Sequence, residues 1–115
     1  MQFFDTHAHL SYEPLVDSVA QIIADAQAVG VSQIAAIATE LRSSLQCVAL
    51  AEQHEGVFAS VGVHPTGCHQ ATTGQWNEIV DLLKHPKVVA LGETGLDCYW
   101  DDCPLPIQQL SLIHI

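Results

Sequence analysis

Residues 5–10 read Asp5-Thr6-His7-Ala8-His9-Leu10, and the interpretation of the whole chain starts from this stretch. It follows Phe3 and Phe4, so a short apolar strand leads directly into two histidines separated by one residue. Alternate residues of a strand point to the same face, which places both imidazoles on one side. One strand can therefore offer two nitrogen ligands to a metal ion, although a His-x-His pair taken alone is usually two ordinary histidines.

Outward from this stretch, helical and extended patterns alternate along the chain. Apolar residues recur at helical spacing in three segments, and a fourth helix is expected to begin near Pro104. The three helical segments are residues 14–29, 43–54 and 75–84. Short apolar strands are expected at residues 31–38, 57–63 and 88–91, and a loop at 66–74. This alternation predicts an α/β fold with right-handed crossovers and a parallel sheet.

Two parallel architectures fit this pattern, and the polar residues discriminate between them. His7 and His9, then His64, then Glu93 follow three different expected strands. The carboxyl ends of parallel strands form one rim, where a (β/α)8 barrel builds its active site. A doubly wound nucleotide-binding module would favour a glycine-rich loop after the first strand, and the sequence has none there. We therefore expect the N-terminal half of a TIM-type (β/α)8 barrel, about four βα units, truncated.

The chemistry of this rim points to a metal centre. Glu93 is flanked by Gly92 and follows a buried strand, where an unpaired carboxylate is costly and requires a cation or a hydrogen-bonding partner. A carboxylate that caps nearby backbone amides is the alternative. Two histidines and a carboxylate on strand ends form half of a binuclear site, in which the carboxylate bridges two ions about 3.5 to 4 Å apart.

Two further polar residues are candidates for the same rim. His64 precedes Pro65 and is a candidate substrate-binding or supporting residue, although a histidine hydrogen-bonded within its own loop would explain it equally well. Asp97 lies four residues after Glu93 and is expected to orient a ligand or to brace the loop. A simple turn carboxylate would also account for Asp97.

Composition limits the functions that this chain can carry. With 115 residues, 49% hydrophobic and 14% charged, the chain is sufficient for one small domain. Thirteen acidic residues against three basic ones give a net charge of -10, which argues against a long nucleic acid groove, so a metal would have to hold any phosphate substrate. No leader or membrane-spanning run is evident, and a cytoplasmic location is expected. The four cysteines lack the spacing of a zinc or redox motif and are assigned no chemistry.

Three motifs, taken together, resemble those of the TatD family of metal-dependent hydrolases. They are residues 5–10, Gly62-Val63-His64-Pro65, and Gly92-Glu93-Thr94-Gly95-Leu96-Asp97. The resemblance implies a TIM-type barrel of the amidohydrolase superfamily, a two-metal site and hydrolysis of phosphodiester bonds, in several members as a deoxyribonuclease. Carried over by position, His7 and His9 would bind one divalent ion (Mg, Mn or Zn), and Glu93 would bridge to the second and position the metal-bound water. His64 and Asp97 match family motif positions.

The resemblance covers residues 1–109, and residues 110–115 are expected to be a non-native tail. A complete barrel needs about 250 residues, so we interpret the chain as a partial domain with weak or absent activity of its own. For the full-length parent, DNA ends or small phosphodiesters are the expected substrates. Two alternatives remain: a non-catalytic half barrel that binds metal and self-associates, and an amidohydrolase acting on cyclic amides. The second is disfavoured because many such enzymes bridge their metals with a modified lysine, whereas Glu93 occupies that position here.

Overall fold

The computed structural model describes residues 1–114, in which strands and helices alternate. The strands are β1 (Phe3–Ala8), β2 (Val31–Ile37), β3 (Val57–Val61) and β4 (Val88–Leu91). The α-helices are α1 (Val19–Ala28), α2 (Leu41–Gln53), α3 (Thr73–Leu82) and α4 (Leu105–His114). Two 3-10 helices, η1 (Leu15–Ser18) and η2 (Pro65–Gln70), complete the list.

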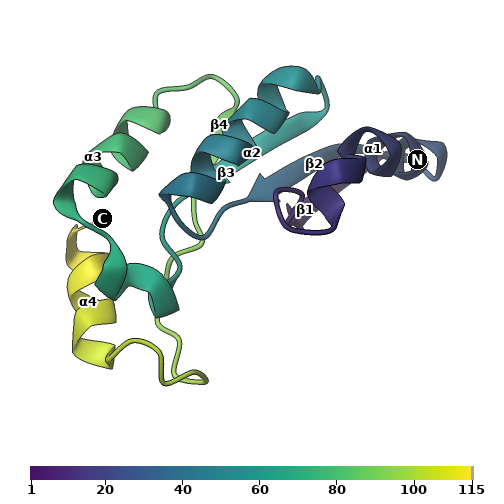
Figure 1. Ribbon diagram of the computed structural model, residues 1–115. Helices are drawn as coiled ribbons and strands as arrows, with labels where there is room; N and C mark the ends of the chain where they lie inside the picture. The colour runs from purple at the N-terminus through teal and green to yellow at the C-terminus, as the bar shows by residue number, and fades with distance from the viewer. Residues whose placement is uncertain (115) are drawn as a thin grey trace.

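All four strands belong to one parallel sheet in the order β1-β2-β3-β4. Each strand is therefore hydrogen-bonded to the next strand along the chain, as in a barrel built from successive βα units. Helix α1 packs against β2, and α2 packs against β2 and β3. The elements follow an open arc from α1 at one end to α4 at the other (Figure 1). The predicted α/β class and parallel sheet are confirmed.

The hydrophobic core lies between the two inner strands and the helices. Strand β3 is buried along nearly its whole length, and the second half of β2 is buried as well. Trp76 and Ile79 of α3 and Cys47 of α2 belong to the same buried cluster. The outer strand β1 is mostly exposed, and β4 exposes its two middle residues while Val88 and Leu91 pack against the core. The apolar runs therefore predicted strands correctly, but burial is concentrated on the two central ones.

The segment 66–74, expected to be a loop, contains most of η2. Pro65 occupies the first turn of η2, where a missing backbone N–H costs nothing and its fixed φ suits a helix. His64 caps this turn, because its ring accepts a hydrogen bond from the Thr66 backbone amide. The first expected helix is likewise divided into η1 and α1. The His64 cap and Pro65 explain why η2 forms where the sequence lacks apolar periodicity, whereas η1 has no side-chain cap.

Helix α4 runs from Leu105 to His114 and so crosses the boundary predicted at residue 109. The non-native origin of residues 110–115 stays a prediction, and residue 115 lies outside the described residues. Among the helices of residues 1–114, none combines the length and the apolar character needed to cross a bilayer. The cytoplasmic location stays a prediction too.

Candidate metal centre

Three predicted ligands meet although they come from opposite edges of the sheet. In a flat sheet, β1 and β4 would be three strand spacings apart, or about 14 Å. Yet Nε2 of His7 lies 3.6 Å from Oε1 of Glu93, and Nε2 of His9 lies 3.6 Å from Oε2. Curvature of the sheet and the length of these side chains close the gap, as happens on the inside of a barrel.

Backbone hydrogen bonds hold the segment that carries Glu93. The amide of Glu93 donates to the carbonyl oxygen of Ala38 (3.0 Å), just beyond β2, and Gly92 donates to Val61 (2.9 Å) in β3. A Cβ on Gly62 would lie 2.8 Å from both the carbonyl carbon and the carbonyl oxygen of Gly92. Glycine at position 62 therefore permits the close approach of two backbones that places Glu93 at the rim.

Hydrogen bonding holds the His9 ring in an orientation that suits a metal ligand. Its Nδ1 lies 3.1 Å from the carbonyl oxygen of Ile37. A carbonyl only accepts, so Nδ1 is the donor of this hydrogen bond, and in the neutral imidazole the lone pair on Nε2 is then left for a metal ion. This arrangement, with a backbone carbonyl behind the ligating imidazole, is the usual support of a metal-binding histidine. The Asp5 carboxylate accepts from the His7 backbone amide at 3.1 Å and steadies the second ligand.

The donor set fits a divalent cation. Ligand atoms of His7, His9 and Glu93 all lie within 4.8 Å of one another. Two ligands of one tetrahedral ion, each bonded at about 2.1 Å, are about 3.4 Å apart, close to the 3.6 Å observed for each imidazole and the carboxylate. His7 is exposed and the other two are half-buried, which leaves room for water and further ligands. In residues 1–114 no other trio of potential ligands comes as close.

His64 lies in the same region as this trio. A hollow of about 370 Å³ is lined by His9, Tyr12, Thr39, His64, Thr66 and Glu93. Nδ1 of His64 accepts from the Thr66 amide (3.2 Å) and lies 2.8 Å from the Thr66 hydroxyl. In the neutral imidazole the proton is then on Nε2, which remains a donor. The structure thus places His64 beside the predicted ligands while also showing the loop hydrogen bonds of the alternative interpretation.

Asp97 does not line this hollow. Its Oδ1 accepts from the amides of Tyr99 (2.8 Å) and Trp100 (3.3 Å), which is the geometry of a turn carboxylate. Its own amide donates to Oε1 of the buried Gln108 at 2.7 Å, and Nε2 of Gln108 donates back to the Asp97 carbonyl at 2.9 Å. These contacts brace the loop after β4, and a part for Asp97 in ligand binding stays a prediction.

Sequence reasoning missed three hydroxyl-bearing residues in the hollow, namely Tyr12, Thr39 and Thr66. Thr39 could have been predicted, because it directly follows the expected strand 31–38 and therefore lies at the rim. Tyr12 lies three residues after His9, and no periodicity marks it. Its placement depends on contacts with the segment after β2, which is distant in the sequence.

Two cysteines that had no assigned role lie against each other. The Sγ atoms of Cys68 and Cys103 are 3.4 Å apart, and both residues are buried. Burial, reinforced by the neighbouring Cys103, raises the pKa of Cys68 to about 11. Burial also raises the pKa of Cys47, in part offset by its hydrogen bond to Ser11. These thiols stay protonated near neutral pH and act as small core residues.

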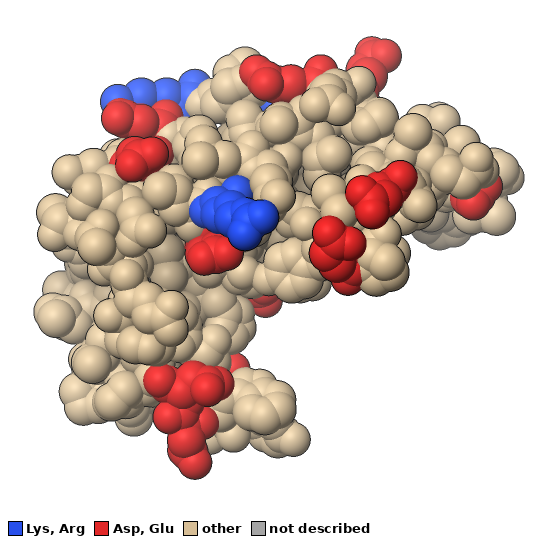
Figure 2. Space-filling view, viewed as in Figure 1, with Lys and Arg blue, Asp and Glu red and all other residues tan. Residues whose placement is uncertain are grey.

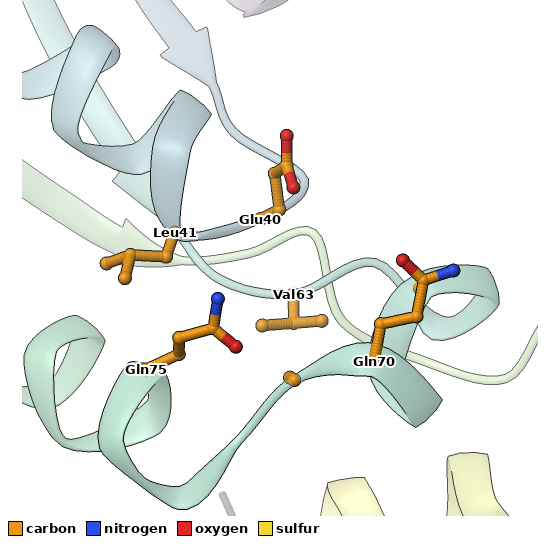
Figure 3. A pocket seen from close by; sticks show the side chains of 7 residues that line it. Glu40, Leu41, Val63, Gln70 and Gln75 are labelled. Atoms are coloured by element: carbon orange, nitrogen blue, oxygen red, sulfur yellow. The ribbon is translucent and has the colours of Figure 1, made fainter.

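A smaller cavity of about 160 Å³ lies behind the rim, between the start of α2 and the segment from η2 to α3 (Figure 3). Glu40, Gln70 and Gln75 contribute its polar groups, and Val63 lies between them (Figure 3). The polar groups of Glu40 and Gln75 are engaged in helix capping boxes, with Ser43 and Thr72 respectively. We therefore attribute this cavity to helix capping.

Surface charge agrees with the composition. Figure 2 shows acidic side chains distributed over the visible face, with basic side chains in only a few places. The sequence contains only Arg42, Lys84 and Lys87 as basic residues. A cation-binding rim is compatible with this charge, because carboxylates attract metal ions.

Comparisons with known proteins agree with the geometry. Residues 4–114 match the family model described as TatD related DNase. The chain is 34% identical over 106 residues to "Uncharacterized metal-dependent hydrolase YabD" of Bacillus subtilis, covering 92% of this chain and 42% of the relative. It is 33% identical over 94 residues to "3'-5' ssDNA/RNA exonuclease TatD" of Escherichia coli K12, covering 82% and 36%.

A solved structure confirms the fold. The crystal structure of YjjV, a TatD homologue from Escherichia coli K12, superposes with a TM-score of 0.89 at 32% identity, covering 96% of this chain and 44% of that protein. The four βα units therefore match under half of a TIM-type barrel protein, as the sequence predicted. The chain spans less than half the length of the relatives that it matches here.

Proposed function

The chain belongs to the family of TatD-related DNases, and on this basis we propose that the whole protein is a metal-dependent hydrolase of phosphodiester bonds. The observation that carries the proposal is the convergence of His7, His9 and Glu93 from the two outermost strands. The exonuclease activity named for the Escherichia coli relative supports strand ends of DNA as the substrate. The charge of -10 favours ends or small phosphodiesters over a long groove.

Each residue has a distinct part in this proposal. His7 and His9 would hold one of two divalent ions (Mg, Mn or Zn), and Glu93 would supply its carboxylate to that ion and to the second. When bound, the ions supply a site for the scissile phosphate and lower the pKa of water. The Ile37 carbonyl keeps the His9 proton on Nδ1. His64 offers its Nε2–H to a substrate oxygen from the wall of the hollow.

The 115-residue chain itself is expected to hydrolyse substrate weakly or not at all. Three convergent ligands in residues 1–114 are fewer than two ions require. Metal affinity is therefore the property to test in this chain, and hydrolysis is the property to test in a longer protein that contains it.

The decisive experiment combines these two properties. Glu93→Gln should weaken Mn²⁺ binding, measured by titration calorimetry, by more than about 100-fold, beyond the loss typical of removing an outer supporting group. Glu78→Gln, on the exposed face of α3, serves as the control and should bind as the parent chain does. In the longer protein, Glu93→Gln should abolish Mn²⁺-dependent cleavage of bis(p-nitrophenyl) phosphate and of a single-stranded oligonucleotide. Unchanged affinity together with unchanged cleavage would refute the proposal.

A specific observation also favours the second candidate, a half barrel that binds metal and self-associates without catalysis. Strands β1 and β4 have open edges, and Phe3, Phe4 and Val89 expose apolar surface along them. Open edges with apolar side chains pair readily with another chain. Sedimentation should then show a dimer of the 115-residue chain. A monomer at all concentrations would eliminate this candidate.

A further inference from the structure

The hollow beside the proposed metal centre contains more polar groups than the metal requires. His9 and Glu93 account for one side, and His64 with Thr66 for another. Tyr12 and Thr39 complete it with two hydroxyl groups. We propose that Tyr12 and Thr39 together bind a phosphoryl oxygen of the substrate next to the metal centre. This inference rests on the proposed function, since the metal supplies most of the positive charge for the phosphate.

The hydroxyl groups of Tyr12 and Thr39 are hydrogen-bonded to each other, and one of their two O–H hydrogens is left without an acceptor in this pair. Oη of Tyr12 lies 2.5 Å from Oγ1 of Thr39, and either atom can be the donor. Two hydroxyls carry two protons, and their mutual hydrogen bond uses one of them. The second proton is available to an acceptor in the hollow. A phosphoryl oxygen is a strong acceptor, and its charge strengthens such a hydrogen bond.

Both hydroxyls are held in position relative to the metal ligands. The Tyr12 ring stacks on the His9 imidazole, with centroids 5.0 Å apart and planes inclined by 23°. The Thr39 backbone is fixed on both sides, because its amide donates to Oγ of Ser43 (2.9 Å) and its carbonyl accepts from the His64 amide (2.8 Å). Tyr12 remains 42% exposed, so a ligand can reach it. Positions fixed in advance reduce the entropy lost on binding.

The scarcity of basic residues makes neutral donors necessary. Lys84 contacts the Asp81 carboxylate at 2.6 Å, and Lys87 contacts the Glu55 carbonyl oxygen at 2.7 Å. Arg42 lines the neighbouring hollow together with Glu13 and Glu40. The hollow with the metal ligands is lined by no lysine or arginine of residues 1–114. Neutral donors are therefore left for the phosphoryl oxygens that the metal does not hold, namely the hydroxyl groups of Tyr12 and Thr39 beside Nε2–H of His64.

The test uses the 115-residue chain loaded with Mn²⁺, and inorganic phosphate as the probe. The unpaired electrons of Mn²⁺ broaden the ³¹P resonance when phosphate binds close to the ion, so titration yields a dissociation constant without any turnover. The variants are Tyr12→Phe, which keeps the ring on His9, and Thr39→Val, which keeps the side-chain shape. Tyr99→Phe, on the exposed loop after β4, is the matched control.

Either variant should weaken phosphate binding about tenfold, as expected for the loss of a hydrogen bond to a charged group. The double variant should weaken binding more than either single variant, because it leaves neither hydroxyl to donate to the phosphate. Thr39→Ser keeps the hydroxyl group and should bind phosphate as the parent chain does, and Tyr99→Phe should have no effect on phosphate binding. Mn²⁺ affinity should change by less than about twofold throughout, since no metal ligand is altered.

Two results would overturn the inference, and they are distinguishable. Unchanged phosphate binding in Tyr12→Phe and Thr39→Val, with Mn²⁺ bound normally, would refute the hydroxyl site and leave the proposed function intact. Failure of the parent chain to bind Mn²⁺ at all would refute the metal centre, and the hydroxyl site with it.

Discussion

The inner strands β2 and β3 and the outer strands β1 and β4 differ sharply in burial. Ala36 of β2 and Val57 of β3 have no exposed surface, whereas Phe3 of β1 is 52% exposed and Val89 of β4 is 56% exposed. All three convergent ligands lie on or directly after the outer strands. The inner strands therefore contribute most of the buried apolar surface of the sheet, and the outer strands carry the candidate metal ligands.

Physical requirements explain this division. Apolar side chains stabilise the fold when water is excluded from them. Strands β2 and β3 have a neighbouring strand along each edge, and α2 packs against both. A metal centre needs access for ions, water and substrate. Strands with an open edge and an exposed face provide that access, and curvature of the sheet brings their ends together.

The largest expected effect is the increase in the free energy of unfolding when a metal ion binds the candidate ligands of the outer strands. Mn²⁺ at 100 times its dissociation constant should raise the free energy of unfolding by about 2.7 kcal/mol, because only the folded chain brings the ligands together. Urea unfolding with Mn²⁺ and with EDTA measures this difference. The double variant His7→Ala/His9→Ala should lose the increase, and the exposed His69→Ala should keep it. An equal increase in the double variant would place the ion elsewhere.

The same substitution on an inner and an outer strand tests the comparison directly. Val57→Ala should lower the free energy of unfolding by about 2 kcal/mol, because the side chain is fully buried. Val89→Ala should change it by no more than about 0.5 kcal/mol. Denaturant unfolding of both variants provides the measurement. Equal losses would show that β4 is covered in solution, as self-association would require.

Gly62 joins the two regions, because it lies after β3 and touches the segment that carries Glu93. Gly62→Ala should lower the free energy of unfolding by at least about 1 kcal/mol, since its Cβ would collide with the Gly92 backbone. It should also weaken Mn²⁺ binding by displacing Glu93. Gly67→Ala is the control, because no atom lies within 4 Å of its Cβ. Normal Mn²⁺ affinity in Gly62→Ala would show that Glu93 does not depend on this contact.

The buried Cys68 thiol should have no such effect near neutral pH, but in alkaline solution it should make the stability of the chain depend on pH. The pKa of Cys68 rises from its ordinary value of 9.0 to about 11 in the folded chain, chiefly because of burial. The folded state therefore holds this proton more tightly than the unfolded state does. Its contribution to stability is fully present below pH 9 and is lost as the pH rises through 11.

Urea midpoints measured between pH 8 and pH 11 would reveal this loss. Cys68→Ala should flatten the decline, whereas Cys98→Ala, which removes an exposed thiol, should not. An identical decline in all three proteins would show that Cys68 does not contribute to it.

Local sequence was sufficient to predict most elements. The strand at 88–91 was predicted at its observed bounds, and the other apolar segments were located to within a few residues. The main difference was η2, since it depends on Pro65 and on the cap from His64 rather than on apolar periodicity. Capping turns of this kind are encoded by two or three residues and carry no repeating signal.

The candidate site was predictable only in part, for a related reason. His7, His9 and Glu93 could be grouped because each follows a strand, and parallel strands end at one rim. Tyr12 could not be grouped with them, because its place depends on its contacts with the His9 ring and with Thr39, which is 27 residues away in the sequence. The contact between Cys68 and Cys103 could not be predicted either, because the two residues are 35 positions apart in the sequence.

The amino-acid sequence by itself determined the alternation of strands and helices, the parallel sheet, the membership in the family and the residue types at the strand ends. These properties depend on local periodicity and on short motifs. Only the tertiary structure decided that ligands from β1 and the segment after β4 lie 3.6 Å apart, and that Tyr12 and Thr39 share the hollow beside them. The reason is the curvature of the sheet, which results from packing over the whole chain and cannot be predicted from any single segment.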